Sequence, residues 1–98
     1  MLLDELETVL KSRVDADPEQ SYTARLLNDS ELTQRKIMEE AFEVCLELAR
    51  ARPDAVGGPD RSRVAEEAAD VIYHLLVGLV GASVSLDEVM AVLAERRQ

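Results

Sequence analysis

A chain of 98 residues is long enough for one hydrophobic core and too short for two, so we expect a single domain over residues 1–98. Nearly half of the residues are hydrophobic, aromatic side chains are scarce, and Ala, Leu, Val, Glu and Arg dominate, which favours helices over sheets. The formal net charge of −9 argues against a protein that binds nucleic acids or anionic membranes, because clustered Lys and Arg make phosphate contacts.

The N-terminal segment has the pattern of an amphipathic helix. Leucine and valine recur at helical spacing over residues 2–10, and acids occupy the first turns, where the helix dipole favours them. We expect this helix to end at residues 13–14 and a polar break with a proline to follow over residues 15–20. A short element over residues 21–27 comes next, with Ser21 as its candidate N-cap.

A longer helix is expected over residues 31–50. Asn28 has capping-box spacing with Glu31, and Ser30 is a second candidate for the cap. At about 100° per residue, one arc of this helix holds the apolar residues Ile37, Ala41, Val44, Cys45 and Leu48. Because Cys45 is the single cysteine and lies on that arc, we interpret it as a reduced packing residue.

Residues 52–60 are rich in Pro and Gly and predict one clear loop, which we expect to be mobile. A third helix begins around Arg61 and is apolar nearly all round after Asp70, which is typical of a buried helix. In so short a chain, a helix buried on every side indicates that a second subunit supplies part of the cover, so we expect a homo-oligomer. The apolar run over residues 71–84 is too short to span a bilayer.

The last helix opens at Ser85, which forms a capping box with Glu88, and it closes at Arg96 and Arg97, where cations suit the helix dipole. The predicted fold class is therefore all-α, a small bundle of four main helices. The N-terminus is acidic where a targeting segment would be basic, so we expect no signal peptide and a cytoplasmic protein.

Each of the two long central helices carries a pair of carboxylates three residues apart, Glu40 with Glu43 and Glu67 with Asp70. Residues at i and i+3 lie on the same side of a helix, one turn apart. Both pairs border strongly apolar stripes, where ionised carboxylates must be neutralised. Four oxygen ligands from two neighbouring helices suit Mg²⁺, which prefers hard oxygen donors.

The alternative interpretation is that these carboxylates lie on solvated helix faces and form salt bridges with Arg35, Lys36 and Arg63. Similar ambiguity holds for three other residues. His74 fits a buried core histidine or a base, Tyr73 fits packing with its hydroxyl at an interface, and Arg25 fits a phosphate ligand or a counter-charge.

A family resemblance bears on this choice. Glu39-Glu40-x-x-Glu43 followed by Glu67-x-x-Asp70 resembles the signature of the all-α nucleoside-triphosphate pyrophosphohydrolase superfamily. Within it, the segments Ser-Tyr-Thr-Ala-Arg-Leu at 21–26, Lys-Ile-Met-Glu-Glu-Ala-Phe-Glu at 36–43 and Asp-Val-Ile-Tyr-His-Leu-Leu-Val at 70–77 are similar to those of the phosphoribosyl-ATP pyrophosphohydrolases. The resemblance spans about residues 2–93.

The resemblance implies Mg²⁺-dependent hydrolysis of the α–β phosphoanhydride of phosphoribosyl-ATP, which yields phosphoribosyl-AMP and pyrophosphate in the second step of histidine biosynthesis, with Mn²⁺ as an alternative ion. It also implies a homodimer or larger assembly with the site near the subunit interface. The implied metal ligands are Glu40, Glu43, Glu67 and Asp70. The implied catalytic residues are Glu39 and Glu40, with Glu39 orienting or deprotonating the attacking water. The implied substrate-binding residues are Ser21, Tyr22, Thr23, Arg25, Lys36, Tyr73 and His74.

Two other functions stay open at this point. One is a housekeeping pyrophosphatase that acts on non-canonical nucleoside triphosphates, and the other is a non-catalytic helical module whose acidic stripe binds a basic partner. Whether the enzyme acts on phosphoribosyl-ATP or on other nucleoside triphosphates, so acidic a protein repels a polyphosphate substrate until metal neutralises the carboxylates. We therefore expect substrate binding to depend strongly on Mg²⁺.

Overall fold

The computed structural model describes residues 1–52, 54 and 60–97. These residues form α-helices and no strands, so the predicted all-α class is confirmed, with four long helices and one short one. The helices are α1 (Leu2–Lys11), α2 (Tyr22–Leu27), α3 (Ser30–Arg50), α4 (Arg61–Gly81) and α5 (Leu86–Arg96).

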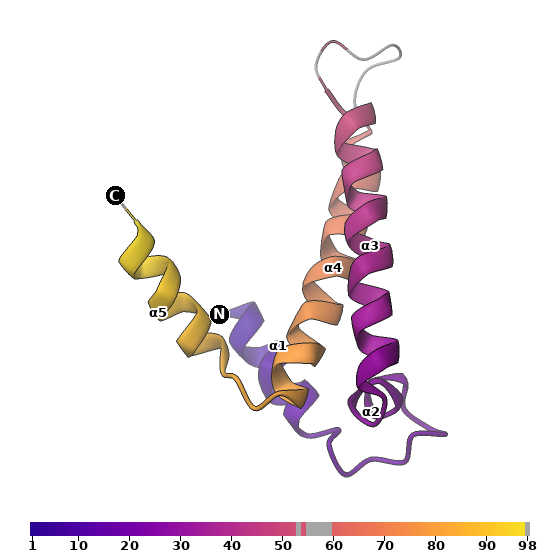
Figure 1. Ribbon diagram of the computed structural model, residues 1–98, viewed down its shortest axis with the longest axis vertical. Helices are drawn as coiled ribbons and strands as arrows, with labels where there is room; N and C mark the ends of the chain where they lie inside the picture. Colours follow the sequence, from indigo (N-terminus) through magenta and orange to yellow (C-terminus); the bar gives the residue numbers. More distant parts are fainter. Residues whose placement is uncertain (53, 55–59, 98) are drawn as a thin grey trace.

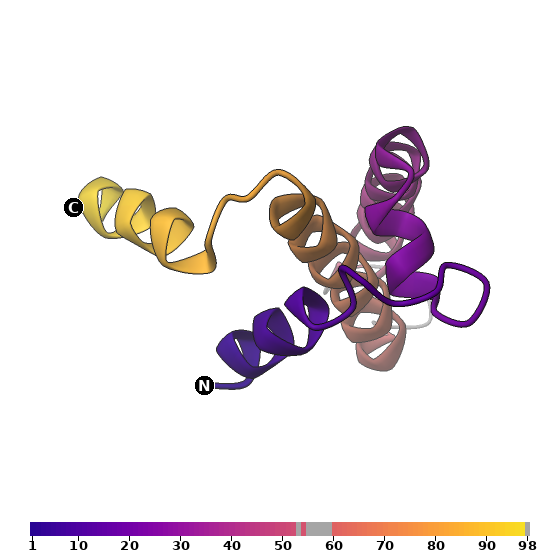
Figure 2. The same ribbon diagram turned by 90° about the horizontal axis from the view of Figure 1, so that it is seen from below.

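The fold is organised around a long antiparallel hairpin of α3 and α4, which lie side by side along their length (Figure 1). Helix α2 packs across the end of the hairpin where α3 begins, and α1 packs against the C-terminal half of α4. Helix α5 projects away from the hairpin in both views (Figure 2).

Two of the predicted helix caps are confirmed. Ser21 caps α2, and its hydroxyl oxygen accepts a hydrogen bond of 3.1 Å from the backbone N–H of Ala24. At α5, the Ser85 side chain accepts from the Glu88 backbone while the Glu88 carboxylate accepts from the Ser85 backbone at 2.7 Å, so the capping box is complete. These hydrogen bonds satisfy backbone donors that a helix start leaves without partners.

The prediction for the start of α3 was wrong. Neither Asn28 nor Ser30 caps this helix; the cap is Asp29, whose carboxylate accepts from the backbone N–H of Leu32 at 3.1 Å. The Asn28 amide instead donates to the carbonyl oxygen of Ala24 at 2.7 Å, at the end of α2. Because α2 and α3 follow each other so closely, Asn28 closes α2 and the next residue, Asp29, opens α3. Helix α1 also ends earlier than predicted, at Lys11 rather than at residues 13–14.

The core lies at the open end of the hairpin, where α1, α2 and the start of α5 meet the C-terminal half of α4. Its buried hydrophobic residues are Leu10, Ala24, Leu26, Leu76, Val77 and Leu86. Gly78 lets α4 approach α3 closely, because a Cβ atom built there would lie 3.4 Å from Cδ1 of Ile37.

Two apolar faces are not covered within the single chain, and for α4 the prediction is that a second subunit supplies part of this cover. Helix α4 is not covered on all sides, since Ile72 and Leu75 are each 47% exposed. On α3, Cys45 is exposed and Leu48 is 53% exposed, although both lie on the predicted apolar arc. The reason is that each helix of the hairpin packs mainly against the other, and the described part of the chain supplies no further helix to cover these faces.

The predicted loop over residues 52–60 lies between α3 and α4, and its residues 53 and 55–59 are outside the described part of the structure. Among the described residues, no single helix has the length and hydropathy needed to cross a membrane. Helices α4 and α5 reach that threshold only when they are counted together, and the chain bends by 112° between them.

Candidate functional site

Three of the predicted metal ligands converge halfway along the hairpin. One carboxylate oxygen from each of Glu40 on α3 and Glu67 and Asp70 on α4 lies within 4.8 Å of the other two. Glu67 is buried, with 8% of its surface exposed, Glu40 is half-buried and Asp70 is exposed. The cluster therefore reaches from the helix interface to solvent, and we call these three residues the carboxylate cluster.

Glu43, the fourth predicted ligand, is exposed and does not belong to this set of mutually close oxygens. Its side chain nonetheless lies close to the cluster, as shown by its contribution to the raised pKa of both Glu40 and Glu67. The structure thus brings three of the four carboxylates together and places Glu43 next to them.

The electrostatics of the cluster favour a bound cation. Burial raises the pKa of Glu40, and the carboxylates of Glu43 and Asp70 raise it further. Burial also raises the pKa of Glu67, with Glu43 adding to the effect and Arg63 opposing it. In each residue the Oε2 atom is buried and has no hydrogen-bond partner among the described residues. Two buried anionic oxygens without donors, next to a third carboxylate, fit a hard divalent ion.

Salt bridges neutralise part of this region, as the alternative interpretation required. Arg63 lies 3.6 Å from Oε1 of Glu67 and 3.7 Å from Oε1 of Glu47. Glu47, which is 7% exposed, also pairs with Arg50 at 3.0 Å. Glu47 is not among the predicted site residues, although it lies one helical turn beyond Glu43. Arg63 thus pairs with the Oε1 atoms of Glu67 and Glu47, while Oε2 of Glu40 and Oε2 of Glu67 have no donor among the described residues.

Glu39, the predicted water-orienting residue, is not part of the carboxylate cluster. It is exposed and pairs with Lys36 at 3.5 Å on the surface of α3. Consecutive residues of a helix point about 100° apart, so Glu39 faces a different direction from Glu40.

Four of the predicted substrate-binding residues form one polar cluster between α2 and α4, beside Asp70. The Tyr22 hydroxyl lies 3.0 Å from Nε2 of His74, and the Thr23 hydroxyl lies 2.6 Å from that of Tyr73. The rings of Tyr22 and Tyr73 are nearly parallel, with centroids 6.3 Å apart. These contacts hold α2 against the hairpin close to the carboxylates.

The remaining predicted substrate-binding residues lie around this polar cluster. The charges of Lys36 and Arg25 both act on the Tyr22 phenol and lower its pKa, although burial outweighs them and raises it overall. The Ser21 hydroxyl is used as the cap of α2. The roles of these side chains toward the substrate stay predictions.

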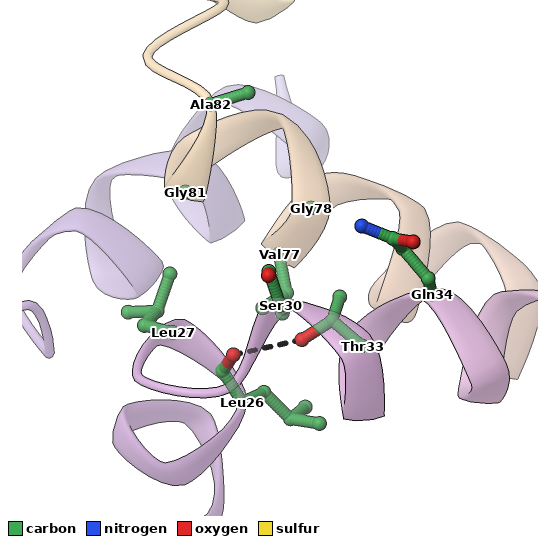
Figure 3. A pocket seen from close by; sticks show the side chains of 9 residues that line it. All are labelled: Leu26, Leu27, Ser30, Thr33, Gln34, Val77, Gly78, Gly81 and Ala82. Carbon is green, nitrogen blue, oxygen red and sulfur yellow. Dashed lines mark hydrogen bonds between the residues drawn. The ribbon is translucent and has the colours of Figure 1, made fainter.

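A separate hollow lies between α2, α3 and the C-terminal end of α4 (Figure 3). Thr33 and Leu26 both line this hollow, and the Thr33 hydroxyl donates a hydrogen bond of 2.8 Å to the carbonyl oxygen of Leu26. Most of the other lining residues are apolar or small, and the hollow includes none of the predicted site residues. The carboxylate cluster is therefore the stronger candidate for the functional site.

The described residues define an all-helical class of protein, in which two long antiparallel helices bring three carboxylates together. Within that class, the chain belongs to the phosphoribosyl-ATP pyrophosphohydrolase family, whose model matches residues 3–97. It is 45% identical over 96 residues to a phosphoribosyl-ATP pyrophosphatase of Cereibacter sphaeroides, covering 97% of this chain and 85% of the relative.

Relatives with the same name in other bacteria show similar agreement. The Methylobacterium nodulans protein is 43% identical over 96% of this chain and 81% of its own length. The Caulobacter sp. protein is 40% identical over 97% of this chain and 81% of its own length. The predicted family is confirmed, and with it the prediction of an enzyme, a pyrophosphohydrolase, in place of a non-catalytic module.

Proposed function

We propose that this chain hydrolyses the α–β phosphoanhydride of phosphoribosyl-ATP to phosphoribosyl-AMP and pyrophosphate, in the second step of histidine biosynthesis, with a divalent cation bound by the carboxylate cluster. The observation that carries the proposal is the convergence of Glu40, Glu67 and Asp70, two of which keep a buried oxygen with no donor in the described part of the chain. Membership of the phosphoribosyl-ATP pyrophosphohydrolase family supports the substrate.

Glu40, Glu67 and Asp70 would hold the ion, and Glu43 is close enough to the cluster to join them. Mg²⁺ suits this set of carboxylates, because it prefers hard oxygen ligands and commonly shares its coordination with substrate phosphates; Mn²⁺ is an alternative. When bound, such an ion clamps phosphate oxygens and stabilises the negative charge that develops on them during hydrolysis.

The cationic residues near the cluster are suited to the substrate's phosphates. Lys36 and Arg25 lie near Tyr22, on the side of the cluster where α2 packs. The Lys36–Glu39 pair is solvent-exposed and therefore contributes little to stability, so its two side chains can separate when substrate arrives. Lys36 would then bind phosphate, and Glu39 would be released to orient or deprotonate the attacking water.

We also propose that the enzyme works in the cytoplasm as a homodimer or larger homo-oligomer. Large apolar side chains are exposed along the hairpin, among them Met38 at 64% and Phe42 at 65% on α3 and Ile72 at 47% on α4. An apolar face of this kind is typical of a subunit interface. Residues two apart on a helix point about 200° apart, so Met38 and Phe42 lie on the side of α3 opposite to Glu40.

Light scattering on the purified chain is expected to give a mass at least twice the 10.9 kDa of one chain. Phe42→Asp is expected to shift the protein toward the monomer, because it introduces a charge into the apolar face. A wild-type protein that stays monomeric at micromolar concentration would contradict the proposed assembly.

The substrate is tested by following pyrophosphate release from phosphoribosyl-ATP and from deoxynucleoside triphosphates, with Mg²⁺ present. We expect phosphoribosyl-ATP to give the higher kcat/KM, with phosphoribosyl-AMP as the second product. Equal or faster hydrolysis of the deoxynucleoside triphosphates would instead favour the housekeeping pyrophosphatase.

A further inference from the structure

We propose that His74 is a positioning residue that holds the Tyr22 hydroxyl as a hydrogen-bond acceptor, and that Tyr22 uses this acceptor to bind a ribose hydroxyl of the nucleotide. The inference deepens the proposed function and rests on it for the substrate class. It assigns Tyr22 to the sugar rather than to the phosphates, and it follows from counting the protons in one chain of hydrogen bonds.

The chain of hydrogen bonds begins at the backbone of Asp70. Its carbonyl oxygen lies 2.9 Å from Nδ1 of His74, one turn further along α4. A carbonyl oxygen only accepts hydrogen bonds, so Nδ1 must carry the proton. In a neutral imidazole the second nitrogen is then an acceptor, and Nε2 of His74 lies 3.0 Å from the Tyr22 hydroxyl. The phenol of Tyr22 therefore donates its proton to His74.

Because the Tyr22 proton is used in this way, the phenol oxygen offers only lone pairs to any further partner. Oxygen atoms of phosphate at neutral pH are also acceptors, so they do not pair with it. A phenol is protonated at neutral pH, and burial raises the pKa of Tyr22 further, so the hydroxyl has a proton to donate to His74. A ligand group that bonds to this oxygen must bring its own proton.

Tyr22 is in a position to bind such a group. It is 44% exposed, whereas His74 behind it is 7% exposed. The charges of Lys36, Arg25 and Glu40 all act on the phenol, which therefore lies near cationic side chains and near one carboxylate of the cluster. In a nucleotide whose phosphates are bound there, the nearest groups with O–H donors are the ribose hydroxyls.

The rigidity of the surrounding rings supports a positioning role for His74. Its ring packs edge-on against Tyr73, with centroids 5.0 Å apart, and against Tyr22, at 6.0 Å. The hydroxyl of Tyr73 is itself bound by Thr23 of α2 at 2.6 Å. Because His74 bonds to the backbone of Asp70, the position of the Tyr22 oxygen is tied to that of the carboxylate cluster.

Binding of ATP, 2′-deoxyATP and 3′-deoxyATP to the wild-type enzyme in Mg²⁺ tests the assignment without requiring turnover. We expect ATP to bind about tenfold more tightly than at least one of the deoxy analogues, since one hydrogen bond is lost. In Tyr22→Phe we expect ATP to bind more weakly and the deoxy analogue to bind as before, so that the preference disappears. Equal weakening of all three nucleotides, or no preference in the wild type, would overturn the proposal.

The role of His74 is tested by three variants. His74→Phe and Tyr22→Phe are each expected to raise KM about tenfold, with a smaller change in kcat. The KM of the double variant is expected to be no higher than that of either single variant. His74→Gln is expected to recover most of the loss, because its amide oxygen can accept from Tyr22. Additive effects in the double variant would show that the two residues act independently and would overturn the coupling.

A spectroscopic measurement on the wild type needs neither substrate nor variants. The chain contains a single histidine, so the ring ¹⁵N resonances need no assignment by mutation. At about pH 8 we expect the Nδ1–H tautomer, with an unprotonated Nε2 that shifts in Tyr22→Phe. An Nε2–H tautomer or a doubly protonated ring would overturn the proposal. This result is independent of pyrophosphate release, so it separates failure of this inference from failure of the proposed function.

Discussion

Glu40→Gln is expected to lower kcat/KM for pyrophosphate release by about 100- to 1000-fold, because a lost metal ligand removes several kcal/mol of transition-state stabilisation. The glutamine keeps the shape of the side chain, so the loss reports on charge and metal binding rather than on packing. Glu66→Gln is the matched control, since it removes an exposed carboxylate from the helix that carries Glu67 and Asp70. We expect that control to keep nearly full activity.

Without metal, Glu40→Gln is expected to be at least as stable as the wild type at neutral pH. The pKa of Glu40 is raised above its ordinary value of 4.5, so its contribution to stability is fully present below that value and is lost as the pH rises through the folded-state pKa. The stability gained by the variant should therefore be greatest at neutral pH and vanish in acid. Loss of helical circular dichroism in both Glu40→Gln and Asp70→Asn, with or without metal, would instead assign these carboxylates a structural role.

Removal of divalent cations is expected to weaken nucleotide binding by at least about 100-fold, because an unscreened cluster of like charges repels the phosphates. The whole chain carries a net charge of −9, and the oxygens of Glu40, Glu67 and Asp70 lie within 4.8 Å of one another. Calorimetric titration in Mg²⁺ and in EDTA at matched ionic strength measures the effect. Equal affinity in the two buffers would refute metal-dependent binding.

Thermal unfolding gives an independent check on the same site. Mg²⁺ binds the folded carboxylate cluster and not the unfolded chain, so it should raise the Tm of the wild type. The rise should be much smaller in Asp70→Asn and unchanged in Glu66→Gln. An equal rise in all three proteins would place the bound ion elsewhere, and no rise in any of them would contradict a bound ion.

Most of the helices could be predicted because their signals are local. Hydrophobic spacing, Pro and Gly at the breaks, and the Ser85–Glu88 box all act within one or two helical turns, and the resulting helices agree closely with α2, α3 and α5. The family resemblance could be recognised for the same reason, because the paired acids at 40 and 43 and at 67 and 70 are close in the sequence and need no knowledge of the fold. The failure at Asp29 arose where two helices meet with almost no linker.

Which side chains meet between helices depends on how the hairpin packs, and sequence spacing does not specify that. The packing of α3 on α4, which includes the close approach at Gly78, brings Glu40 to Glu67 and Asp70 while Glu43 stays outside the set. The bond between Tyr22 and His74 joins residues 52 positions apart and likewise required the folded chain. Local hydrogen bonding sets where each helix begins and ends, but contacts between helices depend on the relative rotation of two packed helices, which is determined by side-chain packing along their whole length.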